Sequence, residues 1–233
     1  MKKLLFLLLT ATLALPSLAQ RIIQKTMPVG KDQIVNLNLR FADSIQVRYW
    51  DKPDLSVRIS VTINGGKLDD ALVVTTGSTD GEVSLKTDYD KELIKKGKPE
   101  DCPDQKYSSW SNNRDGTHTV VCSDINYVVF LPRQAQLKLE TINGNIDIQG
   151  ASAPVMAKSI SGFVDMSWPK SKGANVEMKT ITGEVYSNLD IAFKGKKERH
   201  SHVGYLLEGT VNGGGTTVRL ESISNDVFLR EQK

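Results

Sequence analysis

Two aspartates are the first candidates for chemistry in this sequence, because they occupy the same position in two copies of a repeated sequence motif. Asp147 follows Gly144 by three residues, and Asp165 follows Gly162 by three residues. If the two segments stack in register as strands, their carboxylates lie within about 5 Å of each other. Carboxylates at that spacing suit a Ca²⁺ site or the acid pair of a retaining glycosidase. The equivalent residues of the other two copies are aromatic, so the acidic row ends there and a solvated face is the favoured interpretation.

The histidines and the known catalytic motifs offer less. His200 and His202 lie in and beside a basic loop, Lys194–His200, and could form a weak metal pair, but no carboxylate or cysteine clusters with them. The third histidine, His118, lies in a polar segment elsewhere. The sequence contains no GxSxG, HExxH, Walker or dinucleotide-binding motif. We therefore expect no cofactor, no metal and no catalytic residues, and predict that the protein is not an enzyme.

The two cysteines lie within that polar segment. Cys102 and Cys122 are 20 residues apart and form no CxxC motif. In an exported chain this arrangement favours a disulfide over a metal pair or a redox site. Tyr107 and Trp110 stand between the cysteines, flanked by serine and asparagine. These two aromatic residues either pack the segment onto the body of the protein or form an exposed pair that contacts a sugar or protein partner.

A sequence motif that occurs four times in the second half of the chain must position the two aspartates. Its copies share the pattern apolar-x-apolar-x-Thr/Ser-Ile-x-Gly/Asn-x-Ile/Val and occupy Leu137–Gly150, Val155–Trp168, Val176–Leu189 and Val218–Glu231. The anchoring residues, spaced by 18, 21 and 42 positions, are Gly144, Gly162, Gly183 and Asn225. The last interval is twice 21, which indicates a 21-residue period with one skipped copy. A fixed period of this size is typical of stacked repeat folds.

Within each copy, apolar residues alternate, then change parity at a Gly or Asn, which predicts two short strands joined by a bend. Glycine and asparagine accept the positive φ that such a corner can require. Stacking in register predicts an interior ladder of isoleucines, namely Ile142, Ile160, Ile181 and Ile223. Beside it we expect a hydroxyl ladder formed by Thr141, Ser159, Thr180 and Ser222. No copy buries enough apolar surface to fold alone, so the strands are expected only as an array.

These patterns predict an all-β protein. The favoured architecture is a β-solenoid-like stack of short strands with rungs of about 21 residues and a more irregular N-terminal β region. The alternative is an antiparallel β-sandwich, because sandwiches also give short strands at regular spacing. The predicted divisions are an N-terminal β-strand region at 20–87, a polar insertion with the disulfide at 88–124, and the repeat region at 125–233.

Residues 1–19 have the composition of a signal peptide. Lys2 and Lys3 precede the apolar run Leu4–Leu15, and a small-x-small cleavage site ends at Ala19. The run of about 12 residues is shorter than the roughly 20 that a membrane span needs. We therefore predict export to the periplasm or to the cell surface or extracellular space, and a mature chain without a transmembrane segment. Loss of the two lysines lowers the formal charge from +3 to +1, which gives no general attraction to nucleic acid.

The repeated segments resemble a known family. The run Tyr127–Pro132, the copies LKLETINGNIDIQG, MKTITGEVYSNL and VRLESISNDVFLRE, and Val211–Gly215 are similar to the bacterial "putative adhesin" family of β-strand-repeat domains of unknown function. The earlier stretch Asp43–Asp51 is similar to the N-terminal strand pair of that family, so the resemblance covers most of residues 34–231. It implies an exported or envelope-associated β-solenoid-like domain without a catalytic motif. The insertion and the basic loop depart from the family pattern.

The predicted function is that of a noncatalytic cell-envelope or surface protein, an adhesin or scaffold that presents its β-repeat surface to an envelope protein or a glycan. One alternative is a carbohydrate-active β-helix enzyme that uses Asp147 and Asp165. Another is an envelope-stress accessory protein that acts through a membrane partner.

Overall fold

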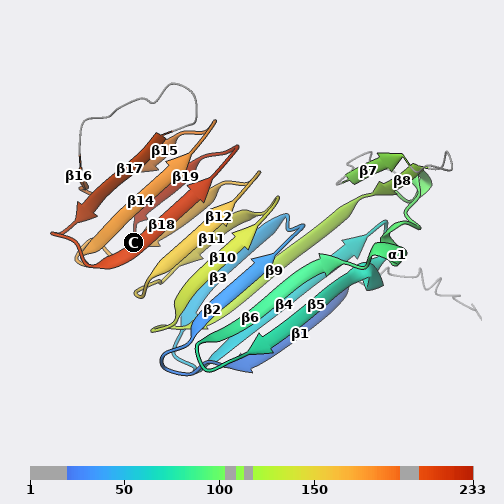
Figure 1. The fold of residues 1–233 in the computed structure, drawn as a ribbon, viewed down its shortest axis with the longest axis horizontal. Coiled ribbons are helices and arrows are strands. Elements are labelled where there is room, and N and C mark those ends of the chain that lie inside the picture. The colour runs from blue at the N-terminus through green and yellow to red at the C-terminus, as the bar shows by residue number, and fades with distance from the viewer. Residues whose placement is uncertain (1–19, 103–108, 113–117, 195–204, 233) are drawn as a thin grey trace, which may run out of the picture.

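A computed structural model describes residues 20–102, 109–112, 118–194 and 205–232, so the predicted signal peptide lies outside the described residues (Figure 1). Two large mixed sheets dominate the fold. Sheet A contains, from edge to edge, β1 (Arg21–Pro28), β4 (Asp54–Ile63), β9 (Ser123–Pro132), β3 (Ser44–Trp50), β11 (Asn145–Gln149), β13 (Val164–Trp168), β19 (Val227–Glu231) and β15 (Val185–Ser187). Sheet B contains β16 (Ala192–Phe193), β17 (Tyr205–Val211), β14 (Ala174–Thr180), β18 (Thr216–Ser222), β12 (Val155–Ser159), β10 (Gln136–Thr141), β2 (Ile34–Leu39), β6 (Glu82–Tyr89) and β5 (Leu72–Ser78).

The remaining elements are small. A single helical turn, α1 (Lys91–Ile94), and a two-stranded ribbon of β7 (Ser109–Asn112) and β8 (His118–Val121) lie between β6 and β9. Short 3₁₀ turns occur at Asp69–Ala71 and Pro99–Asp101. The all-β prediction is therefore confirmed. None of the helices in the described part of the chain is long and apolar enough to cross a membrane.

The core lies between the two sheets and follows from the alternation of apolar residues. In β10, Leu137 and Leu139 are buried while Lys138 and Glu140 point outward, as the two-residue period of a strand requires. The same alternation runs through the central strands of both sheets, and their buried side chains form one hydrophobic cluster. Trp168, at the end of β13, is a fully buried member of this cluster and donates its indole N–H to the carbonyl of Lys172 at 2.9 Å.

Consecutive strands contribute one strand to each sheet, and we call each such pair a rung. The rungs are β2/β3, β10/β11, β12/β13, β18/β19 and β14/β15, in their spatial order, and neighbouring rungs pair in parallel. The stack therefore does not follow the sequence (Figure 1). The fourth copy, β18/β19, lies between the second and third, with Val218 paired to Val155 on one side and to Val176 on the other.

The prediction of one skipped copy is wrong. The chain between the third and fourth copies instead forms β16 and β17, which pair antiparallel with each other, and β17 pairs antiparallel with β14 at the end of sheet B. The long interval between Gly183 and Asn225 thus corresponds to an edge extension and a return into the stack.

The predicted hydroxyl ladder is present at the corners and is buried. Ser159 shows the pattern: its Oγ accepts the N–H of Gly162 in its own rung and donates to the carbonyl of Gly144 in the neighbouring rung, both at 2.9 Å. The other corners repeat both bonds through Thr141, Ser222 and Thr180. Each hydroxyl satisfies a buried amide and a buried carbonyl that would otherwise lack a partner. The hydroxyls therefore tie one rung to the next.

The predicted interior isoleucine ladder is wrong. Ile160 and Ile181 are 39% and 37% exposed, and Ile142 and Ile223 are only half-buried. The strand alternation continues through the hydroxyl residue, so the isoleucine that follows it faces outward. The change of parity comes at the corner itself, after the isoleucine.

The corner glycines are required for close approach and not for positive φ. Gly144, Gly162, Gly183 and Asn225 are absent from the residues with positive φ in the described chain. A Cβ built on Gly162 would lie 2.1 Å from the carbonyl oxygen of Gly144, and one on Gly183 would lie 2.2 Å from that of Asn225. At Gly162 and Gly183 the backbone of the neighbouring corner packs directly against the glycine, which leaves no room for a side chain, whereas the fourth corner holds the side chain of Asn225.

The N-terminal part contains one regular rung and several antiparallel strands. β2 and β3 pair in register with the first copy, Leu37 opposite Leu139 and Ile45 opposite Ile146. β1, β4 and β5 pair antiparallel around this rung and extend the sheets. Two facing mixed sheets fit a sandwich-like description as well as a solenoid-like one, and the division into regions at 20–87, 88–124 and 125–233 remains a prediction.

Candidate functional site

The outer face of sheet A carries the residues that the sequence singled out for chemistry. Because the rungs stack in register, Asp147 of β11 pairs with Asp165 of β13, which pairs with Phe228 of β19, which pairs with Tyr186 of β15. The expected adjacency of the two aspartates is confirmed. The four strands run from β11, in the middle of sheet A, to β15 at its edge, and Figure 1 labels β11, β19 and β15 along this direction.

Each aspartate is held by an arginine from a neighbouring strand. Arg48 Nη2 donates to Asp147 Oδ2 at 3.0 Å, and Arg230 Nε lies 2.9 Å from both carboxylate oxygens of Asp165. A guanidinium thus takes the place where a cation would bind the carboxylates. The described residues contain no group of three or more metal-ligating side chains. The pair therefore gives no support to a Ca²⁺ site or to an unpaired acid for glycoside hydrolysis.

An aromatic stack lies next to these ion pairs. The rings of Tyr186 and Phe228 are parallel within 13°, with centroids 5.1 Å apart, and Phe163 meets Phe228 edge-on at 6.3 Å. The guanidinium carbon of Arg230 lies 4.5 Å from the Phe228 centroid. Tyr186 is 50% exposed and belongs to β15, the edge strand of sheet A. The stack therefore presents an aromatic ring to solvent at the end of the sheet.

A shallow depression of about 410 Å³ adjoins the ion pairs. Its lining is mostly polar and comprises Asp147, Gln149, Asp165, Ser167, Arg230, Glu231 and Gln232. Gln149 donates its amide N–H to both oxygens of Asp147, at 3.2 and 3.3 Å. The side chains of β11, β13 and β19 thus form a connected polar surface beside the aromatic stack.

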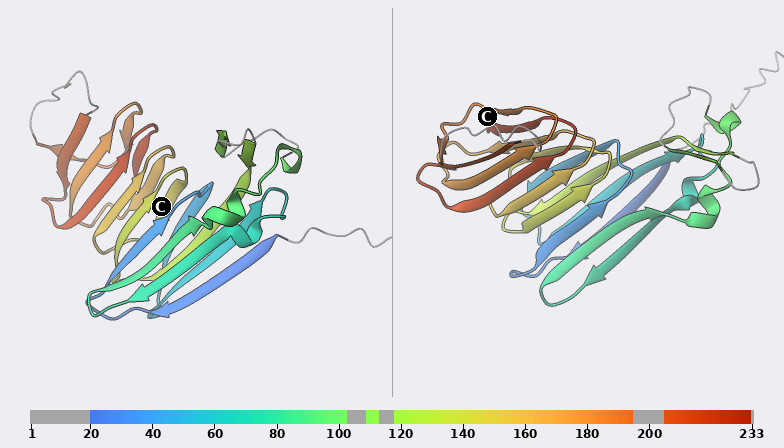
Figure 2. Two further views of the ribbon diagram at one scale, coloured as in Figure 1. Left: turned by 45° about the vertical axis from the view of Figure 1, so that its right-hand side comes forward. Right: turned by 45° about the horizontal axis from the view of Figure 1, so that its top comes forward.

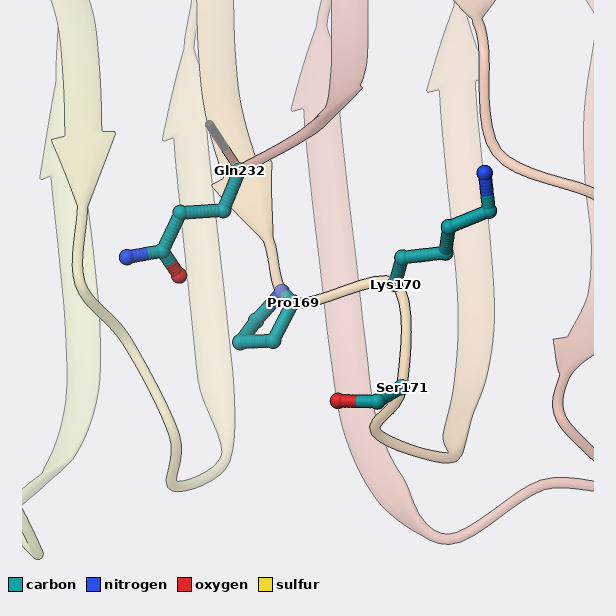
Figure 3. A pocket seen from close by; sticks show the side chains of 4 residues that line it. All are labelled: Pro169, Lys170, Ser171 and Gln232. Atoms are coloured by element: carbon teal, nitrogen blue, oxygen red, sulfur yellow. The ribbon is translucent and has the colours of Figure 1, made fainter.

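A second hollow of about 570 Å³ lies nearby, over the turn after β13. Figure 3 shows its four lining residues, Pro169, Lys170, Ser171 and Gln232. The amine of Lys170 and the amide of Gln232 point away from each other, so the side chains do not converge on a common point. This hollow offers little to fix a ligand, and Gln232 is its link to the depression.

A second aromatic pair lies on the same face of sheet A, toward its N-terminal half. Trp50 stacks on Phe130 with ring centroids 5.0 Å apart, and Lys52 Nζ lies 4.8 Å from the Trp50 ring. The indole N–H of Trp50 donates to the carbonyl of Asp54 at 2.8 Å, which fixes the ring. Arg48 stands two residues before Trp50 on β3, so the two aromatic pairs flank the arginine–aspartate pairs.

The outer face of sheet B differs in character. Its centre is a network of opposite charges in which Glu221 lies 3.1 Å from Lys158, 3.9 Å from Lys179 and 3.8 Å from Arg219. These charges satisfy one another along the strands, as paired cross-strand side chains do. The exposed aromatic stacking described above belongs to sheet A.

The titratable groups whose pKa is raised by desolvation lie elsewhere and are structural. Tyr127 shares a hydrogen bond of 3.1 Å with Thr87 Oγ1, and burial raises the pKa of Tyr127 far above its ordinary value. Burial also raises the pKa of Tyr89 to about 12. At the exposed residue Asp43, partial desolvation of the carboxyl group raises the pKa, although the carboxylate accepts the N–H of Ile125 at 2.8 Å. The tyrosines stay neutral at physiological pH and serve packing rather than proton transfer.

The predicted disulfide is confirmed. Cys102 and Cys122 are bonded, with their Cα atoms 5.8 Å apart, and close the insertion between β6 and β9. Tyr107 lies outside the described residues, and of Trp110 the structure describes only the backbone, in β7. Their role in partner binding remains a prediction. Figures 1 and 2 place the insertion at the opposite end of the molecule from β15.

We expect removal of this disulfide to destabilise the protein by about 3 kcal/mol, the loop-entropy value for a closed loop of this length. The variant Cys102→Ser/Cys122→Ser leaves no free thiol and should show this loss in urea unfolding. A reductant should lower the stability of the unmodified chain to that of the double variant and leave the variant unchanged. Equal stability of both proteins without reductant would contradict this expectation.

Of the three histidines, His118 lies in β8, and His200 and His202, the weak metal pair considered from the sequence, lie outside the described residues.

The arginine partners are what sequence reasoning missed. Arg48 lies 99 residues from Asp147 in the chain, and Arg230 lies 65 residues from Asp165. The only available signal was that Arg230 stands two residues after Phe228, on the outward side of the same strand.

Comparison with known proteins agrees with this fold. No protein-family model matches the sequence, and no curated protein matches it. A crystal structure described as a "putative cell adhesion protein" from Clostridium sporogenes superposes with a TM-score of 0.51 at 12% identity, over 92% of this chain and all of that one. A "putative adhesin" from Bacteroides fragilis gives a TM-score of 0.31 at 11% identity, over 92% of this chain and 98% of that one. The superposition on the Clostridium sporogenes structure confirms, as a similarity of fold, the resemblance that the repeated motif predicts.

Proposed function

We propose that this chain is a noncatalytic exported protein that binds a cell-envelope or surface partner through the outer face of sheet A. The observation that carries the proposal is the exposed stack of Tyr186 on Phe228 beside two arginine–aspartate pairs. Aromatic and arginine side chains carry much of the binding energy of protein interfaces, because they bury large areas in well-packed, desolvated pockets. The parallel rungs, as a β-solenoid-like stack, hold this face rigid.

Two further observations support the proposal. The disulfide suits a protein that works in an oxidising compartment outside the cytoplasm. The shared fold with a crystal structure described as a "putative cell adhesion protein" supports a display role. The arginine-held aspartates do not favour the carbohydrate-cleaving alternative, and no observation favours an envelope-stress accessory role. The insertion with Tyr107 and Trp110 is a second candidate contact surface within the same proposal.

The test is binding of the purified chain, residues 20–233, to envelope fractions of the producing bacterium and of neighbouring cells. The variant Tyr186→Ser should weaken binding at least tenfold, the loss expected for an aromatic anchor. The matched control is Met156→Ser, which removes an apolar side chain that is 36% exposed on sheet B. Equal losses in both variants would contradict the role of sheet A, and absence of binding by the unmodified chain would contradict the proposal as a whole.

A further inference from the structure

We propose that the depression on sheet A is a binding subsite for a neutral glycan and that Tyr186 supplies an adjoining stacking platform. This inference rests on the proposed function and specifies its partner.

The lining of the depression carries a mixture of hydrogen-bond donors and acceptors. The lining offers two amides, from Gln149 and Gln232, the hydroxyl of Ser167, the guanidinium of Arg230 and the carboxylate of Asp165. A sugar hydroxyl both donates and accepts, so it is matched by a set that contains donors and acceptors close together. A ligand with donors alone or acceptors alone would engage only part of this set.

The charges at the depression are balanced. Each acid at the depression is paired with a base: Asp147 with Arg48 at 3.0 Å, Asp165 with Arg230 at 2.9 Å, and Glu231 with Lys170 at 3.3 Å. The three ion pairs at the depression therefore carry no net charge. They cannot offset the free energy that an ionic ligand loses when it gives up its water. This balance disfavours phosphorylated, sulfated or carboxylated ligands and favours a neutral one.

The aromatic stack lies in the same cross-strand row as the two aspartates. The order across the four strands is Asp147, Asp165, Phe228 and Tyr186. The distance from Asp147 to Tyr186 is therefore three strand spacings, or about 14 Å. One face of the Tyr186 ring stacks on Phe228, and Tyr186 is half-exposed on the edge strand, so its other face is the stacking surface for a sugar. Pyranose rings have apolar C–H faces that pack on such rings. A ligand that uses both features must be an oligosaccharide and not a single sugar.

The experiment begins with a glycan array that carries neutral and acidic oligosaccharides, probed with residues 20–233. We expect binding to neutral oligosaccharides and then measure affinity for the best of them by calorimetry. Gln149→Ala and Tyr186→Ser should each lower that affinity at least fivefold. Gln136→Ala, an exposed glutamine on sheet B, is the matched control and should leave it unchanged. Binding confined to acidic glycans, or equal losses for Gln149→Ala and Gln136→Ala, would overturn the inference.

Treatment of the envelope fraction separates failure of this inference from failure of the proposed function. Periodate, which cleaves the vicinal diols of sugars, should abolish binding of the chain, whereas protease treatment should leave binding intact. Binding that survives periodate and is lost after protease would overturn the glycan inference and leave the proposed function standing with a protein partner. Absence of binding to the untreated fraction would overturn both.

Discussion

Replacing Gly162 with alanine should destabilise the protein by more than about 3 kcal/mol, a large part of the roughly 5–15 kcal/mol that holds a domain folded. The added Cβ would lie 2.1 Å from the carbonyl oxygen of Gly144 and 2.4 Å from its carbonyl carbon. Both atoms belong to the backbone of the neighbouring corner, so they cannot rotate away as a side chain would. Relief requires the two rungs to separate, which also breaks the buried hydroxyl bonds beside them. Urea unfolding followed by tryptophan fluorescence measures the loss.

The matched control for this substitution is Gly81→Ala. A Cβ built on Gly81 meets no atom within 4 Å, and its φ is not positive. We expect a change within about 0.5 kcal/mol, as for most exposed positions. If Gly162→Ala were as mild as Gly81→Ala, the corners could not be packed backbone against backbone, and the account of the stacked rungs would be wrong.

Removing residues 216–233 should abolish cooperative unfolding. These residues form β18/β19, whose side chains Val218, Leu220, Val227 and Leu229 are fully buried. The rung pairs on both sides, with β12/β13 and with β14/β15, so its loss opens a gap inside both sheets. We expect no sharp transition in thermal circular dichroism and poorly dispersed amide resonances in NMR spectra.

Deletion of β1 is the appropriate comparison for this truncation. Among the described strands, β1 pairs only with β4 at the edge of sheet A, so its loss should lower the melting temperature but keep a cooperative transition. A stack built in sequence order would place β18/β19 at an end, and the two deletions would then have similar effects. A cooperative transition after removal of 216–233 would therefore support sequence order and contradict the observed topology.

The strands and their inward faces could be predicted from the sequence, because burial on one face imposes a two-residue period. Leu137 and Leu139 show it directly, and both are buried. The order of the rungs could not be predicted, because the copies are alike where they pair. Val155, Val176 and Val218 occupy the same position, so any of them fits beside any other. The order of the rungs is set by the connection through β17, which pairs antiparallel with β14 before the chain enters β18. The sequence of the turns in this connection does not indicate where the next strand will pair.

The site was predictable only in part, for a related reason. The repeat places Asp147 beside Asp165, since equal positions in parallel strands become neighbours. The repeat says nothing of Arg48, which comes from a rung outside the four copies. The outward direction of Ile160 was missed because an isoleucine ladder suggested a core, whereas the buried position belongs to the small hydroxyl of Ser159 that binds the corner amide.

The position of the fourth copy also constrains the order of events during synthesis. The ribosome makes a chain from its N-terminus, so β14/β15 emerge before β18/β19, the rung that joins them to β12/β13. Until residues 216–231 follow, the rung β12/β13 and the rung β14/β15 each present an open parallel edge to the other. Direct pairing of these two rungs would be a kinetic trap, because their matching valines allow it. The rungs β12/β13 and β14/β15 must therefore stay apart, or separate again, before β18/β19 can insert between them.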